Sequence, residues 1–375
     1  MNQGINEEPE PGDGGRSEVA GGPWRLCDAA ANRAAEAIRV LEDVARFVLD
    51  DAALTAAAKT LRHDLAAVLA APVFARRVAC RDTVGDVGTT IVTTAALARR
   101  SPADLVAANA ARAAQALRSL QEVALVVAPS EAAQFEALRY RLYTLEKLAA
   151  VLTRAADRLA GVTLCVLVDG RAEPAAFEHL VEQLCEAGVR MIQLRDKHLA
   201  TPDLVDRARR AVAIARRRGL GEPLVVINDR ADVAVAVAAA GVHVGATDLP
   251  VAAARRVIGP DRLVGRTAHG LDEARAAVAD GADYLGIGPC FPSPTKSFAA
   301  FAPHDFLASV SREIALPTFA IGGVTLERLE ELAALGIRRV AVSAAVIDAA
   351  DPGAAAAAFI DRLAALLPER PPTPS

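Results

Sequence analysis

The chain has 375 residues, of which 53% are hydrophobic and 23% are charged, and its formal net charge is −4. This length predicts two domains, or one large barrel with an extension. The hydrophobic content is ample for a buried core, and the slightly acidic balance offers no basic surface to nucleic acid. The composition therefore favours a globular protein that does not bind nucleic acid.

The five cysteines are scattered along the chain without a CxxC pair or a Cys/His metal spacing; they are Cys27, Cys80, Cys165, Cys185 and Cys290. This usage predicts a reducing, cytoplasmic compartment and no structural zinc. Residues 1–23 are rich in Gly, Glu and Pro and lack an apolar core, so we expect a disordered lead and no signal peptide.

Residues 24–158 predict an all-helical domain with an internal repeat. RAAEAIRVLEDVA at 33–45 matches RAAQALRSLQEVA at 112–124 almost position by position. Within the first copy, Glu36, Arg39 and Asp43 are spaced as neighbours on one helix face. These charges either form surface salt bridges or belong to a site. The segment RDTVGDVGTT at 81–90 is either an anion-binding turn or an ordinary one.

Residues 231–254 are hydrophobic enough to resemble a membrane span. They contain Gly241, His243, Gly245 and Asp248, however, so a helix followed by a strand is the better interpretation. We expect no membrane partner.

From residue 161 onward, short apolar runs rich in Val and Ile alternate with helical patterns. Eight such runs occur, at 162–169, 191–197, 223–230, 242–245, 263–269, 284–289, 317–323 and 339–346. Runs of this kind are typical of parallel strands buried on both faces. The rhythm predicts an α/β TIM barrel over residues 161–367, followed by a Pro-rich tail at 368–375.

Polar residues follow most of these predicted strands, and in a TIM barrel the carboxyl ends of the strands share one rim. Arg195, Lys197 and Lys296 are three cations, too many for one carboxylate and suited to a di- or triphosphate. An alternative for Arg195 is a salt bridge with Asp196 or Asp229.

Asp229 and Asp248 are two carboxylates on the same predicted rim. Beside a phosphate chain they would repel the substrate unless a cation lay between them, so they predict a Mg²⁺ site. His243 is expected to pack or to form a hydrogen bond rather than to catalyse, and His269 is left open between the two roles.

A second anion site is predicted where strands seven and eight end. Gly322 and Gly323 close one strand, and Ser343 precedes a helix whose backbone N–H groups would face a phosphate. Ser293 and Thr295 add two hydroxyls beside Lys296. One diphosphate pocket and one monophosphate pocket imply two phosphorylated small-molecule substrates.

Six motifs carry a family resemblance: QLRDK (193–197), NDR (228–230), HVGATD (243–248), GRTAH (265–269), GIGPCFPSPTK (286–296) and AIGGV (320–324). In order and spacing they resemble the strand-end motifs of thiamine phosphate synthase. The resemblance implies that hydroxymethylpyrimidine diphosphate and thiazole phosphate are joined with release of pyrophosphate. The chain departs from the family at Ala246, Thr267 and Arg230, where Gln, Ser and an acidic residue are frequent.

The resemblance also implies roles for the rim residues. The three cations would stabilise the departing pyrophosphate, with Mg²⁺ on Asp229 and Asp248. The other implied contacts are to the substrates: Gln193 and Asn228 to the diphosphate-bearing substrate, Thr267 to a phosphate oxygen, and Gly322, Gly323 and the backbone around Ser343 to the thiazole phosphate.

The helical half is similar to the domain fused to some bacterial thiamine phosphate synthases, through NRAAEAIRVLEDVARFVLDD (32–51), LRHDL (61–65) and RDTVGDVG (81–88). The resemblance implies a phosphomethylpyrimidine kinase that uses ATP. Its candidate ligand residues are Asn32, Arg33, Glu36, Arg39, Asp43, Arg81, Asp82, Asp86 and Arg112. The alternative is a non-catalytic dimerisation or docking module, and a homo-oligomer is left open.

Overall fold

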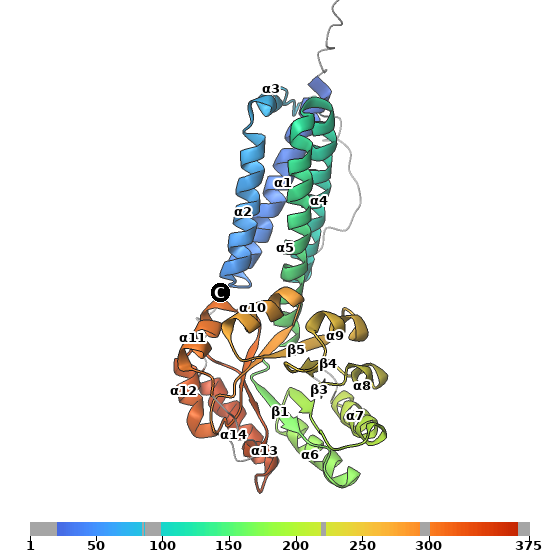
Figure 1. Cartoon of the computed structure of the whole chain (residues 1–375), viewed down its shortest axis with the longest axis vertical. Helices are drawn as coiled ribbons and strands as arrows, with labels where there is room; N and C mark the ends of the chain where they lie inside the picture. Colours follow the sequence, from blue (N-terminus) through green and yellow to red (C-terminus); the bar gives the residue numbers. More distant parts are fainter. Residues whose placement is uncertain (1–20, 85, 87–98, 219–222, 293–300, 367–375) are drawn as a thin grey trace, which may run out of the picture. The chain divides into compact units, whose positions relative to one another are not determined.

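The computed structural model describes residues 21–84, 86, 99–218, 223–292 and 301–366. Helices make up the first part of the chain and a closed barrel the second (Figure 1). The chain divides into two compact units. The first contains Met1–Arg39, Lys59–Ala98 and Asn109–Tyr143, and the second contains Val40–Ala58, Arg99–Ala108 and Thr144–Ser375.

Four long helices dominate the first part: α1 (Gly21–Phe47), α2 (Ala52–Leu69), α4 (Pro102–Val127) and α5 (Ala132–Arg158). Short turns of helix stand between them, namely η1 (Pro72–Phe74), α3 (Arg76–Ala79) and η3 (Pro129–Glu131). Helix α1 begins inside the segment predicted as the lead, and α5 ends at the predicted end of the helical half.

The sequence repeat is visible in the burial of α1 and α4. Copy one buries Ala34, Ala37, Ile38, Leu41, Val44 and Ala45, and copy two buries the equivalent Ala113, Ala116, Leu117, Leu120, Val123 and Ala124. Glu42 and its counterpart Gln121 are also buried. The two copies therefore present the same face to their surroundings, which explains why the apolar positions match so closely.

Eight parallel strands close into a barrel in chain order, which confirms the predicted TIM barrel. The strands are β1 (Leu164–Val168), β2 (Met191–Leu194), β3 (Leu224–Asn228), β4 (Gly241–Val244), β5 (Leu263–Ala268), β6 (Tyr284–Ile287), β7 (Thr318–Ile321) and β8 (Val340–Val342). Each observed strand falls within one of the eight predicted strand segments or overlaps it by most of the strand's length.

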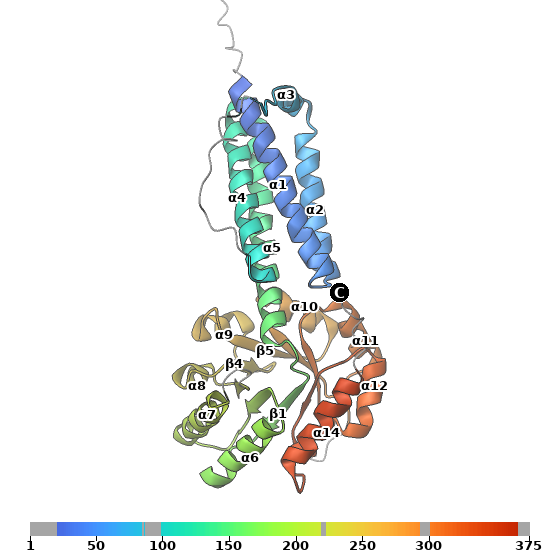
Figure 2. The same cartoon turned by 180° about the vertical axis from the view of Figure 1, so that it is seen from behind.

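The connecting helices lie outside the ring of strands in both views (Figures 1 and 2). They are α6 (Pro174–Glu186), α7 (Thr201–Arg216), α8 (Ala231–Ala236), α9 (Val251–Ile258), α10 (Leu271–Asp280), α11 (His304–Glu313), η4 (Leu326–Arg328), α12 (Leu329–Ala334), α13 (Ala344–Ile347) and α14 (Pro352–Ala365). Residues 231–254 form α8, β4 and the start of α9, as predicted.

Inward-facing side chains fill the base of the barrel. Cys165, Met191, Val226, Leu263, Tyr284 and Phe319 belong to one buried cluster with Leu159 and Val162, which lead into β1. Because side chains alternate across a strand, the residues two and four positions further along each strand point to the same interior, nearer its carboxyl end. The core at the base thus positions the side chains at the rim.

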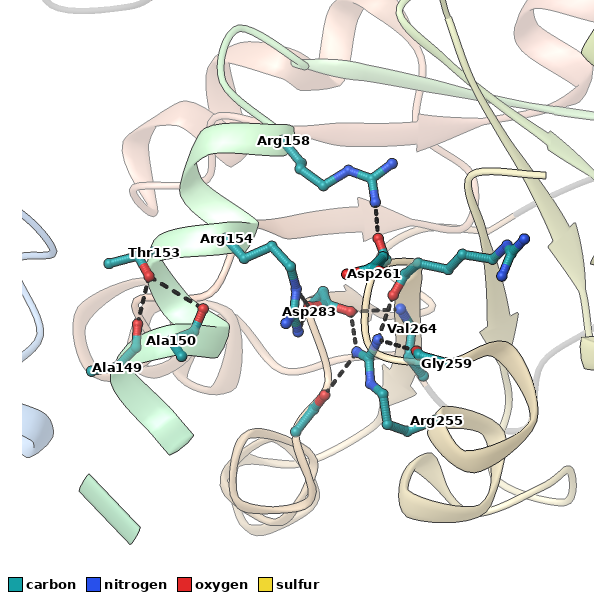
Figure 3. Close-up of polar contacts among 12 residues, drawn as sticks. Ala149, Ala150, Thr153, Arg154, Arg158, Arg255, Gly259, Asp261, Val264 and Asp283 are labelled. Atoms are coloured by element: carbon teal, nitrogen blue, oxygen red, sulfur yellow. Dashed lines mark hydrogen bonds and ion pairs between the residues drawn. The ribbon is translucent and has the colours of Figure 1, made fainter. Parts of the chain in front are cut away.

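A buried carboxylate connects α5 to the amino-terminal side of the strands (Figure 3). Asp283, whose side chain is 0% exposed, accepts hydrogen bonds from Arg154 at 2.6 Å and from the backbone N–H of Val264 at 2.7 Å, and it also pairs with Arg255. Arg158 donates to the carbonyl of Asp261 beside this group. Two guanidinium groups and one amide therefore satisfy a charge that would otherwise be costly to bury.

No helix among the described residues is both long and apolar enough to cross a bilayer. All five cysteines lie in the described part of the chain as free thiols, and Cys27, Cys165 and Cys290 are buried.

Candidate active site

A cavity of about 760 Å³ opens at the carboxyl ends of the strands. Most of the described residues predicted for the rim line it: Gln193, Arg195, Asn228, Thr267, Gly322, Gly323 and Ser343. They come from five strands or strand-end loops, although up to about 150 positions separate them in sequence. The barrel thus collects a polar wall around a single hollow.

Alternation along β2 shows how local structure sets this wall. Met191 points into the buried cluster at the base, Gln193 lines the cavity and Arg195 follows at its edge. Gln193 is only 4% exposed, and the backbone N–H of Arg195 continues the sheet by donating to the carbonyl of Val168 at 2.8 Å. The strand register therefore places an amide and a guanidinium in one column above the core.

Asp229 and Asp248 face each other at the rim. Burial, followed by a hydrogen bond and the like charge of Asp248, raises the pKa of Asp229 to about 6, while the charges of Lys197 and Arg195 act in the opposite direction. Asp248 also accepts from the backbone N–H of Gly245 at 2.9 Å. Two carboxylates held this close favour either a shared proton or a bound cation.

The alternative in which Arg195 forms a barrel salt bridge is not observed among the described residues. Asp196 accepts instead from the backbone N–H groups of Gly170, His198 and Leu199 at 2.7–3.0 Å. The charge of Arg195 lowers the pKa of Asp229, although the two side chains do not form an ion pair. The guanidinium at the cavity edge is consequently available for a ligand.

The glycine pair after β7 is required by the loop that packs over it. Gly322 and Gly323 have φ values of +94° and +65°, and a Cβ on Gly323 would lie 2.2 Å from the carbonyl oxygen of Pro292. The backbone N–H of Phe291 donates to the carbonyl of Gly322 at 2.9 Å. A side chain at either position would push this loop away from the cavity.

Ser343 lines the cavity and precedes α13, but its hydroxyl is already used. It donates to the carbonyl of Leu167 in β1 at 3.0 Å. The carbonyl of Ser343 accepts from the backbone N–H groups of Val346 and Ile347. At this position the backbone of Ala344 and Ala345, which also line the cavity, offers the remaining polar groups.

Two histidines line the cavity. His243 is 7% exposed, and its Nε2 lies 2.8 Å from the hydroxyl of Thr267, while its Nδ1 lies 3.2 Å from the hydroxyl of Tyr284. Burial lowers its pKa to about 4, with the charge of Arg266 acting in the same direction. His243 thus forms hydrogen bonds as predicted, and its ring is neutral at physiological pH.

His269 approaches the carbonyl of Gly288 with Nδ1 at 2.6 Å. A carbonyl only accepts, so Nδ1 carries the proton, and Nε2 of the neutral ring can act only as an acceptor.

Sequence reasoning missed the contribution of β1. Asp169 directly follows this strand and lines the cavity, and its Oδ1 lies 3.4 Å from Arg171. Arg171 in turn donates to the carbonyl of Ile347 at 2.6 Å. Ile347 is the last residue of α13, the helix that follows β8. The signal was present, since Asp169 stands at a strand end like the other rim residues.

Three predicted residues of the strand-six loop, Ser293, Thr295 and Lys296, lie outside the described residues. Lys197 is exposed and is placed near Asp229 by its effect on the pKa of that carboxylate.

Two of the candidates from the helical half, Asn32 and Arg81, form a cluster with Asp28, which is 5% exposed. Arg81 makes a bidentate contact with Asp28 at 2.5 and 2.9 Å, and Asn32 reaches the same carboxylate at 3.5 Å. Arg25 of α1 lies 3.7 Å from the carboxylate of Asp82. This cluster joins α1 to the segment that follows α3.

The other helical candidates differ in their exposure to solvent. Arg33, Glu36, Arg39 and Arg112 are exposed, Asp43 is half-buried and Asp86 is exposed. Arg33, Glu36, Arg39 and Arg112 of the repeat therefore face outward, while its apolar face and Glu42 are buried.

Comparison with known proteins relates both halves to established families. Residues 164–346 match the family model for thiamine monophosphate synthase, and residues 25–148 match the ThiD2 family. The thiamine-phosphate synthase of Rhodopirellula baltica is 41% identical over 331 residues, covering 86% of this chain and 88% of that protein. The chain belongs to the thiamine-phosphate synthase family. It is a transferase of thiamine biosynthesis.

Two further relatives agree. The thiamine-phosphate synthase of Gloeobacter violaceus is 39% identical over 339 residues, covering 90% of this chain and 96% of that protein. Among solved structures, the thiamine phosphate pyrophosphorylase of Pyrococcus furiosus matches with a TM-score of 0.50 and 30% identity, covering 56% of this chain and 98% of that one.

Proposed function

We propose that the barrel joins hydroxymethylpyrimidine diphosphate to thiazole phosphate, giving thiamine phosphate and pyrophosphate. The observation that carries this proposal is the position of Arg195, which lines a cavity with buried polar walls and lies near enough to the Asp229–Asp248 pair to act on the pKa of Asp229, although the two carboxylates do not line the cavity themselves. A guanidinium and a paired-carboxylate cation site are what a departing diphosphate requires.

The carboxylate pair fits Mg²⁺. Magnesium in phosphate sites is held by one or two carboxylates, with its remaining ligands from water and phosphate oxygens. The described residues contain no group of three or more His, Cys, Asp or Glu side chains that could hold a metal ion. When bound by Asp229 and Asp248, the ion would neutralise charge on the diphosphate.

The residues of the chain would then act by binding and orientation. The carbon–oxygen bond between the pyrimidine methylene and the diphosphate breaks, and the bond electrons leave with the pyrophosphate, whose charge Arg195 stabilises. The thiazole ring nitrogen donates its lone pair to the methylene carbon, which forms the new carbon–nitrogen bond. No proton has to move, so no general base is needed. Gln193 and Asn228 would hold the pyrimidine substrate, and the backbone near Gly322 and Gly323 would hold the thiazole phosphate.

Release of pyrophosphate tests this assignment. The purified chain is given the pyrimidine diphosphate, thiazole phosphate and Mg²⁺, and pyrophosphate and thiamine phosphate are both measured. We expect equal amounts of the two products and none without Mg²⁺. Pyrophosphate without thiamine phosphate, or turnover that is unchanged by chelation, would contradict the proposal.

We infer that the helical half phosphorylates hydroxymethylpyrimidine phosphate to the diphosphate, with ATP as the phosphate donor. The match of residues 25–148 to the ThiD2 family supports this inference, as do the contacts of Asn32 and Arg81 with Asp28. Arginine side chains suit phosphate groups because of their bidentate geometry.

The alternative is a non-catalytic dimerisation or docking module. The two are separated by ADP formation from ATP and hydroxymethylpyrimidine phosphate, with no thiazole phosphate present. We expect stoichiometric ADP and diphosphate, and loss of both in Arg81→Met. The matched control is Arg118→Met, an exposed arginine of α4 paired with Glu122. No ADP from the wild-type chain would favour the module.

A further inference from the structure

His243, Thr267 and Tyr284 form a chain of three hydrogen-bonding groups that runs from the barrel core to the cavity. Tyr284 is 2% exposed and packs edge-on against Phe319 in the core, with ring centroids 5.7 Å apart. Thr267 lines the cavity at the other end, and His243 bridges the two hydroxyls. No sequence pattern connects Tyr284 with the site.

Two glycines create the space for this chain. A Cβ on Gly265 would lie 2.1 Å from Cζ of Tyr284 and 2.5 Å from Nδ1 of His243, and a Cβ on Gly286 would lie 3.3 Å from Cε1 of His243. The glycines of β5 and β6 thus leave room for the imidazole of His243, which comes from β4. The fixed ring position is built into the barrel, because any larger residue at 265 would displace it.

The hydrogen positions follow from counting donors and acceptors. His243 is buried without a carboxylate partner, so its ring is neutral and has one N–H donor and one lone-pair acceptor. If Nδ1 carried the proton, it would donate to Tyr284, whose own O–H would then need another acceptor. The described part of the chain offers that hydroxyl no hydrogen-bond partner other than His243. A buried donor without a partner is costly, so the arrangement in which Tyr284 donates to Nδ1 is favoured.

That arrangement decides the direction of the last hydrogen bond. With Nδ1 as acceptor, Nε2 carries the proton and donates to the oxygen of Thr267 at 2.8 Å. The O–H of Thr267 is then free to point into the cavity. We propose that His243 and Tyr284 are positioning residues that hold the Thr267 hydroxyl as a hydrogen-bond donor, so that it binds a substrate acceptor. In the proposed synthase reaction, on which this inference rests, the acceptor is a phosphate oxygen or a ring nitrogen of the pyrimidine diphosphate.

A double-mutant cycle tests the chain, because Tyr284 acts only through Thr267. Thr267→Val removes the donor, and we expect kcat/KM for the pyrimidine diphosphate to fall by roughly 10-fold or more, with the KM for thiazole phosphate unchanged. Tyr284→Phe keeps the ring and should cost about 3- to 10-fold, and Thr267→Ser should restore near wild-type values. The double variant should be no worse than Thr267→Val alone.

Additive effects in the cycle, or an unchanged kcat/KM in Tyr284→Phe, would overturn the proposal. Failure of the synthase assignment itself is distinguishable, since the wild-type chain would then give no thiamine phosphate at all. Competition separates the two acceptor sources: Thr267→Val weakens inhibition by pyrophosphate if a phosphate oxygen is bound, and by hydroxymethylpyrimidine if a ring nitrogen is bound. If Thr267→Val left inhibition by both pyrophosphate and hydroxymethylpyrimidine unchanged, the proposed contact between Thr267 and a substrate acceptor would be contradicted.

The tautomer gives a readout that does not depend on activity. Nitrogen-15 spectra of the histidine-labelled full-length chain, with the signal assigned through His243→Gln, should show a neutral ring protonated at Nε2. In Tyr284→Phe the Nδ1 signal should shift as it loses its donor. A ring protonated at Nδ1 in the wild-type chain would overturn the assignment, whatever the kinetics of the variants.

Discussion

The barrel gathers polar residues in one cavity, whereas the helical repeat turns several of its arginines outward. In the barrel, Gln193 and His243 point inward and are 4% and 7% exposed, and they line one cavity with Arg195. In the helical repeat, Arg33 and Arg112 point outward, and the inward face consists largely of Ala and Leu. The parallel strands of a barrel end at a common rim, so the residues that follow them come close together. Two repeated helices carry their equivalent residues on separate helices, and the repeat does not bring those residues together. Charged and polar residues therefore line a cavity in the barrel, whereas Arg33 and Arg112 of the repeat belong to a solvated surface.

The largest effect is expected where the barrel buries a full charge. Asp283→Ala would leave Arg154 and Arg255 without their shared carboxylate, and the amide of Val264 without its acceptor. We expect the free energy of unfolding to fall by about 3–5 kcal/mol, measured by urea denaturation. The matched control is Asp272→Ala, because Asp272 is 98% exposed in its pair with Arg275. An equally small loss in both variants would show that burial does not determine the contribution of these charges.

Next in size is the loss of the rim cation. Arg195→Ala should lower kcat for thiamine phosphate formation by a factor on the order of 10² or more, because leaving-group stabilisation acts mainly in the transition state. Arg275→Ala, an exposed arginine on α10, is the control and should leave turnover intact. Near-normal kcat in Arg195→Ala would remove this residue from the leaving-group role; Lys296→Ala tests the second predicted cation in the same assay.

A smaller effect is expected from pH. The pKa of Asp229 is raised from 3.8 to about 6, so in the metal-free protein its contribution to stability is present below pH 3.8 and is lost as pH rises through about 6. Mg²⁺ requires the ionised carboxylate and competes with the proton. The Mg²⁺ concentration for half-maximal activity should therefore rise about tenfold for each pH unit below 6.

Asp248→Asn sharpens that test. It removes the like charge, so the pKa of Asp229 should fall and the onset of the pH dependence should move to lower pH, even though Mg²⁺ binds more weakly. A half-saturating Mg²⁺ concentration that stays constant between pH 7 and pH 5 in the wild-type chain would contradict the carboxylate-pair site.

The smallest effect is expected in the helical repeat. Arg118 and Glu122 form an i,i+4 pair in which both side chains are more than half exposed. Glu122→Ala should change the stability by no more than about 0.5 kcal/mol in thermal unfolding. A loss comparable to that of Asp283→Ala would mean that the outward charges of the repeat contribute more than their exposure indicates.

The barrel could be predicted closely because the carboxyl ends of its strands share one rim, so a residue's place after a strand predicts where it lies in the fold. Eight apolar runs gave eight strands, and the residues after them, such as Asn228 and Thr267, arrived at one cavity. The role of Tyr284 could not be predicted, since a tyrosine at the start of a strand is ordinarily a core residue. Its link to the site depends on the absence of side chains at Gly265 and Gly286, which becomes visible only in three dimensions.

The helical half was predicted as helices with a repeat, but the repeat did not predict the cluster around Asp28. No sequence pattern singles out Asp28, because it lies outside both repeat copies and its partner Arg81 is 53 positions away. No strand-end rule relates such residues. Helix periodicity predicts which face is buried, but not which distant loop returns to that face.

The most direct test of the account is thiamine phosphate formation by the full-length chain from two starting mixtures. One contains the pyrimidine diphosphate, and the other contains the pyrimidine monophosphate with ATP; both contain thiazole phosphate and Mg²⁺. We predict product from both mixtures, with the second strictly dependent on ATP, and loss of both in Arg195→Ala. Failure of the wild-type chain to form product from the ready-made diphosphate would contradict the synthase assignment, and product from the monophosphate without ATP would contradict the division of labour between the two halves.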